Sequence, residues 1–138
     1  MRIPTAIPHI KTVFVVVGVL AVGWMALEGD VAREIALAAL VWLPGLAWLV
    51  TRFFGGRRPA MGRWLLLAAA AGALAGAGLV MMTLFLMALK TGLHAHGPEY
   101  TAGQIAWVWG QLPLWAAAGG LAGLGVGAVM GGAVGSRQ

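Results

Sequence analysis

The chain contains no cysteine, and only 9% of its 138 residues are charged. The missing cysteine excludes disulfides, thiolate metal ligands and a thiol nucleophile. Soluble domains carry about 25% charged residues, so this low charge content, together with 61% hydrophobic residues, argues strongly against a water-soluble fold. The length suits a single domain covering residues 1–138.

Catalytic motifs are also missing. Ser136 is the one serine and lies in the tail, and the sequence has no G-x-S-x-G, H-E-x-x-H or phosphate-loop motif. The net charge of +5 does not indicate nucleic-acid binding, because the basic residues lie in short caps between apolar stretches and form no basic face. We therefore expect a protein that is not an enzyme, that binds no nucleic acid, and whose basic residues meet anionic lipid headgroups.

Four apolar stretches are long enough to cross a bilayer as helices, which takes about 20 residues each. The predicted spans are residues 8–27, 31–54, 64–89 and 113–134. Asp30 is placed as the N-cap of the second helix, and Glu34 falls in its first turns. The pattern predicts an all-α integral membrane protein with a bundle of four transmembrane helices.

The last apolar stretch begins near Ala102 and is too long for one perpendicular span. Thr101 and Gln104 form a capping-box pattern, so a helix is expected to start there. Pro113 removes an internal hydrogen bond and favours a kink or break. We therefore predict a short interfacial helix over residues 102–112, carrying Trp107 and Trp109, before the fourth span.

Charge placement predicts the orientation. One side of the membrane would hold seven basic residues and no acid: Arg2, Lys11, Arg52, Arg57, Arg58, Arg63 and Arg137. The other side would hold all four acids with Arg33 and Lys90. The positive-inside rule then places both termini in the cytoplasm, in a cytoplasmic-type inner membrane. A cleaved signal peptide ending near Ala21 or Gly23 is the competing reading of the first apolar stretch.

Five glycines at spacing four, a pattern that lets two membrane helices approach closely, stand near the C-terminus. They are Gly119, Gly123, Gly127, Gly131 and Gly135. The third span offers a matching row in Ala68, Gly72 and Gly76. The two rows predict a helix contact that lies either within the chain or between subunits.

Polar side chains are scarce within the predicted spans. No ionisable residue falls well inside one, and Thr83 and Gln111 are the main polar groups at depth. A Leu-Pro pair between tryptophans occurs in spans two and four, either as a trace of tandem duplication or as a common membrane feature. If the chain conducts a solute, its path is expected near Pro44, Gln111 and Pro113.

The loop after the third span is the most chemical segment. His94 and His96, with Glu99 as an oxygen donor, form a candidate for zinc, copper or tetrapyrrole binding, although two histidines are not a complete site. A polar turn or a contact with a partner chain are the other interpretations. No other cofactor is indicated.

Three functions remain open from the sequence. The leading hypothesis is an accessory or structural subunit of a larger membrane complex, built through glycine-mediated helix packing. The alternatives are a small homo-oligomeric channel or carrier for a neutral or weakly polar solute, and a metal- or pigment-binding membrane protein. In each case Arg52, Arg57, Arg58 and Arg63 are expected at lipid headgroups.

Overall fold

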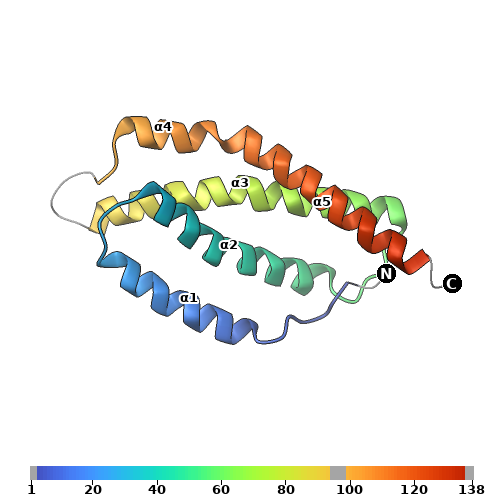
Figure 1. Ribbon diagram of the computed structural model, residues 1–138. Helices are drawn as coiled ribbons and strands as arrows, with labels where there is room; N and C mark the ends of the chain where they lie inside the picture. The colour runs from blue at the N-terminus through green and yellow to red at the C-terminus, as the bar shows by residue number, and fades with distance from the viewer. Residues whose placement is uncertain (1–2, 94–98, 136–138) are drawn as a thin grey trace.

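The structure is a computed structural model, and it describes residues 3–93 and 99–135. Within these ranges the chain is helical and contains no strand. The helices are α1 (Ile10–Met25), α2 (Val31–Phe54), α3 (Met61–Leu93), α4 (Ala102–Gly110) and α5 (Leu112–Gly135), shown in Figure 1.

Three segments are long and apolar enough to cross a membrane: Val31–Phe54, Met61–Leu93 and Ala102–Gly131. They make the protein a membrane-type helical bundle. The fourth, α1, is apolar but has 16 residues, or about 24 Å at 1.5 Å per residue, against a hydrocarbon core of about 30 Å. It is shorter than the predicted 8–27 because His9 takes a left-handed conformation (φ 60°) and the chain turns at Ala26.

The central helix is longer than the sequence predicts. α3 has 33 residues, or about 50 Å, and extends beyond the predicted 64–89 at both ends. At its start the Ala60 carbonyl accepts the bond from the Trp64 N–H (2.9 Å), so the helix begins before the apolar stretch. At its end Lys90 is buried among other helices, so tertiary contacts carry the helix past the last apolar turn.

The long C-terminal stretch breaks at Gln111, close to the predicted break. Thr101 and Gln104 form the capping box that starts α4. α4 closes where the Gln111 N–H donates to the Val108 carbonyl (3.1 Å), and Pro113 then occupies the second position of α5, where its missing N–H needs no partner. Figure 1 shows α4 lying along the end of α3, in the direction of the long axis.

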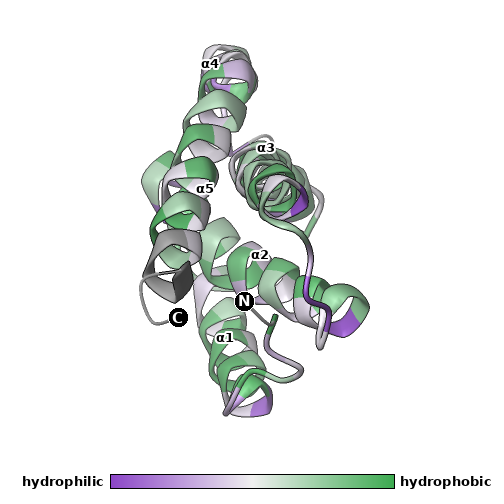
Figure 2. Cartoon of the chain, turned by 90° about the vertical axis from the view of Figure 1, so that its right-hand side faces the viewer, coloured by the Kyte–Doolittle hydropathy of each residue, from purple (hydrophilic) through white to green (hydrophobic). Residues whose placement is uncertain are grey.

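The helices pack side by side in the order α1, α2, α3 and α5, with α4 beside the end of α3. We call this arrangement the open row, because its two end helices do not close into a ring. The main contacts join α1 to α2, α2 to α3, and α3 to α4 and α5. In the end-on view of Figure 2, α5 lies at the upper left and α1 at the bottom, at the two ends of this arrangement. As a result α1 and α5 pack mainly on one neighbour each.

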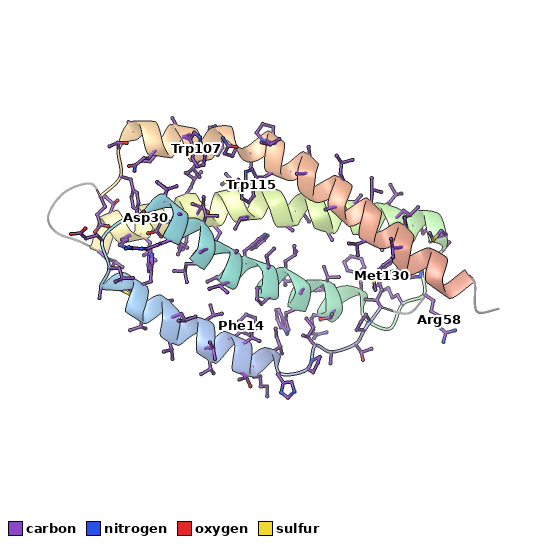
Figure 3. All side chains as sticks on the ribbon, in the orientation of Figure 1. Phe14, Asp30, Arg58, Trp107, Trp115 and Met130 are labelled. Carbon is purple, nitrogen blue, oxygen red and sulfur yellow. The ribbon has the colours of Figure 1, made fainter. Side chains whose placement is uncertain are left out.

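The charges separate to the two ends of the row. The acidic end, where α2 and α4 begin, carries Glu28, Asp30, Glu34 and Glu99, and the arginine end, where α2 stops and α3 begins, carries Arg52, Arg57, Arg58 and Arg63. Figure 3 shows Asp30 and Arg58 at these opposite ends.

Small residues let α3 and α5 touch backbone to backbone. A Cβ added at Gly72 would overlap the Gly119 carbonyl oxygen, and one added at Gly123 would overlap the Ala68 carbonyl oxygen. Gly76 faces the backbone of Trp115 in the same way. The structure thus brings the two predicted rows of small residues together within one chain.

The rest of the glycine row meets side chains. Gly127 lies against Ala68, whose Cβ would be 2.8 Å from an added Cβ, and Gly131 lies against Met61. Gly135 ends α5. The Trp64 indole N–H donates to the Gly127 carbonyl (2.8 Å), which ties the two helices at the arginine end.

Candidate functional site

The most polar interior site lies at the acidic end. It joins Trp24 in the last turn of α1, Glu34 in the first turns of α2, Lys90 in the last turn of α3, and Glu99 and Tyr100 just before α4. We call these five residues the Glu34 cluster. It ties four segments of the chain together at one point.

Local sequence turns the two helix-borne charges inward. The Asp30 carboxylate caps α2 by accepting from the Arg33 N–H (3.0 Å), which fixes where the helix starts. Three and four residues after Glu34 come Leu37 and Ala38, which are buried on the same face. Glu34 therefore enters the interior with an apolar stripe.

Hydrogen bonds hold one oxygen of Glu34. Its Oε1 accepts from the Trp24 indole N–H (2.9 Å) and from the Tyr100 hydroxyl through a short bond. Its Oε2 is buried and has no hydrogen-bond partner among the described residues. The side chain itself has no exposed surface.

Lys90 supplies the positive charge of the site. Its Nζ lies 3.7 Å from Glu34 Oε1 and 3.9 Å from Glu99 Oε2, and 4.8 Å from the centroid of the Trp24 ring. An ammonium over an aromatic face gains a cation–π attraction, which is larger when the ion is desolvated. Lys90 is 1% exposed, so two carboxylates and an indole take the place of its water shell.

The electrostatics of the cluster are those of a buried ion group with more acid than base. Two ionised carboxylates and one ammonium carry a formal charge of −1. Burial, together with donation to the Glu34 carboxylate and the nearby negative charges, raises the pKa of Tyr100 well above its ordinary value. Tyr100 therefore stays a hydrogen-bond donor at neutral pH, and the cluster can hold the four segments in register.

Gly29 allows the loop before α4 to reach this site. A Cβ at that position would lie 2.7 Å from Glu99 Oε2 and 3.1 Å from the Tyr100 ring. A side chain here would press on Glu99 and Tyr100, so the glycine of the α1–α2 connection favours their close approach.

The predicted metal site is covered only in part. His94 and His96 lie outside the described residues, and Glu99 pairs with Lys90. Among residues 3–93 and 99–135 no group of three metal-ligating side chains comes together.

The predicted solute path is not brought together by the structure. Gln111 lines a small apolar crevice with Trp107, Trp115 and the face of α3, and neither Pro44 nor Pro113 borders it. Thr83 donates its hydroxyl to the Leu79 carbonyl of its own helix (2.8 Å). This part of the chain therefore offers few polar groups to a passing solute.

The arginines lie on the surface of the arginine end. Arg52, Arg57, Arg58 and Arg63 are exposed, and the Arg57 guanidinium lies 5.4 Å from the centroid of the Phe54 ring. Their position is compatible with contact to headgroups.

Sequence reasoning missed the Glu34 cluster because each charged member stands near a helix end, where solvent exposure is the ordinary expectation. The partners of Glu34 are up to 66 residues away in the chain. Helical spacing held a local signal, since Glu34 shares a face with Leu37 and Ala38, and Lys90 shares one with Leu86 and Met87.

Comparison of the chain with protein-family models, with curated proteins and with solved structures gives no match.

Proposed function

We propose that the protein is an accessory or structural subunit of a larger membrane assembly. The observation that carries this proposal is the open row of helices, in which α1 and α5 each pack mainly on one neighbour. A chain that worked alone as a channel or carrier would be expected to surround a polar path. The described helices instead gather their buried charged side chains, Glu34 and Lys90, at the acidic end, where they pair with each other.

Broad apolar faces on both sides of the row support the proposal. On α1 the side chains of Val19 and Val22 are 68% and 71% exposed, and on α5 those of Leu121 and Val129 are 70% and 73% exposed. Lipid tails can cover such faces, and so can helices of another subunit.

An open cleft between α2 and α4 favours a protein neighbour on that side. It has a volume of about 550 Å³ and is lined by small residues, Ala32 and Gly103, beside Gln104 and Trp107. Small residues allow a second helix to approach closely, and a side-chain amide at such a place can bond across helices.

We further infer that α1, α2, α3 and α5 each span the membrane. Both termini would then be cytoplasmic, because the arginine end carries basic residues without acids. The missing native cysteine makes this easy to test. A membrane-impermeant maleimide should label Thr5→Cys from the cytoplasmic side and Glu28→Cys from the other side. Labelling of both from one side would refute the proposed span of α1.

Site-specific photo-crosslinking in native membranes tests the subunit role. A photoreactive amino acid replaces Val19 or Leu121 on the open faces, and Met87, which is 2% exposed, serves as the matched interior control. We expect a defined adduct to one and the same foreign chain from an open-face position and none from Met87. Adducts of this chain to itself alone would support the homo-oligomeric alternative and contradict the proposal.

A further inference from the structure

The arginine end contains two adjoining hollows of opposite character. The first, about 190 Å³, lies between α2 and α3 and has an apolar lining that includes Leu46, Val50 and Leu74. The second, about 270 Å³, lies beside the connection between α2 and α3. Both are bordered by Ile3, Phe54 and Leu67, so the two hollows adjoin, and together we call them the crevice.

The second hollow is basic. Arg57, Arg58 and Arg63 border it together with Pro59. In the described part of the chain no carboxylate pairs with these three arginines, because all four acids belong to the acidic end. Three guanidinium groups without an acid are complementary to a phosphate, which accepts bidentate hydrogen bonds from arginine.

Backbone bonds hold the junction between the hollows in place. The Ile3 N–H donates to the Arg57 carbonyl (3.2 Å), and the Gly56 N–H donates to the Ile3 carbonyl (2.9 Å). Gly56 supports this pairing with a left-handed backbone (φ 79°). Ile3 is thereby fixed at the junction, where it is 5% exposed.

We propose that this crevice is a binding site for one anionic phospholipid, with its phosphate at Arg57, Arg58 and Arg63 and part of an acyl chain between α2 and α3. The charge complementarity favours an anion, and the adjoining apolar hollow favours an amphiphile over a free anion. An apolar cavity of about 150 Å³ suffices to bind a small hydrocarbon. General attraction of basic residues to headgroups would hold any anionic lipid at the surface. This site would instead bind one lipid molecule by its phosphate and its acyl chain together.

Native mass spectrometry of the full chain tests the site. The protein is purified in detergent and mixed with phosphatidylglycerol or with phosphatidylcholine of identical acyl chains. We expect retention of one phosphatidylglycerol and little phosphatidylcholine. Because each basic residue near a headgroup contributes about 1 kcal/mol, the variant Arg58→Gln/Arg63→Gln should lower phosphatidylglycerol affinity roughly ten-fold or more.

Control variants test whether lipid retention depends on these particular arginines and on the apolar hollow, or only on the total charge and on added side-chain volume. Arg52→Gln removes a basic residue of the same end that borders neither hollow, and it should retain phosphatidylglycerol. Ala71→Leu narrows the apolar hollow and should weaken retention although every arginine remains, whereas Ala122→Leu on the exposed face of α5 should not.

Three results would overturn the proposal. Equal retention of both lipids would show that the arginines do not select the headgroup. A loss with Arg52→Gln as large as with the double variant would show general charge attraction only. Displacement of the lipid by inorganic phosphate at the lipid's own concentration would show a free-anion site in which the apolar hollow has no part.

Discussion

Removing the one cation of the Glu34 cluster should destabilise the bundle more than any other single surface or end-of-helix change. In Lys90→Met the side chain keeps its unbranched shape and most of its length, but Glu34, with no exposed surface, and the mostly buried Glu99 lose their shared ammonium. Breaking a buried ion pair from one side costs about 3–5 kcal/mol because an uncompensated charge stays buried. The ratio of folded to unfolded protein should fall by roughly 100-fold or more.

The assay is reversible unfolding by titration with sodium dodecyl sulfate in mixed micelles, followed by circular dichroism. Arg33→Met is the matched control, because Arg33 lies next to Glu34 in the first turn of α2 but is exposed. Exposed substitutions usually change the free energy of unfolding by no more than about 0.5 kcal/mol. Adding Glu34→Gln to Lys90→Met should restore part of the loss, since neighbouring groups couple by about 0.5–3 kcal/mol. A Lys90→Met variant as stable as Arg33→Met would show that the Lys90 charge does not stabilise the fold.

The remaining predictions use the same unfolding titration. Gly72→Ala should lower the free energy of unfolding by about 1–3 kcal/mol, because its Cβ would overlap the Gly119 carbonyl. In the control Gly125→Ala the Cβ meets open space, so stability should stay the same or rise by up to about 1 kcal/mol. Equal effects of the two substitutions would contradict the close α3–α5 contact. Trp24→Phe removes a donor to Glu34 and should cost about 1–3 kcal/mol, and an unchanged midpoint would exclude that bond. The pKa of Tyr100 is raised above its ordinary value of 10.0 in the folded state, so its contribution is complete below pH 10 and is lost as the pH rises further. The wild type should therefore lose stability above pH 10 more steeply than Tyr100→Phe, and parallel curves would contradict the shift.

The existence of most of the helices could be predicted from the sequence alone. Apolar length predicts α2, α3 and the C-terminal helices, and the Thr101–Gln104 box predicts where α4 begins. Helix ends are less predictable. A helix can extend through a charged residue such as Lys90 when that residue pairs with a group on another segment. The local sequence pattern does not identify that group.

The polar site was not predictable from single residues. Spacing along one helix reveals that Glu34 faces inward with Leu37 and Ala38, but not that a lysine 56 positions later meets it. That meeting follows from the packing of α1 and α3 beside α2, and Gly29 leaves room for the loop before α4. Only the three-dimensional arrangement joins them.

The most direct test of the subunit role is the composition of the particle that carries this chain in its own membrane. The chain, tagged in place and extracted in lipid nanodiscs without detergent, is weighed by native mass spectrometry and its components are identified. We predict a defined particle holding the 14.2 kDa chain and at least one other polypeptide at fixed stoichiometry. A particle that contains this chain alone, as a monomer or a closed homo-oligomer, would contradict this prediction.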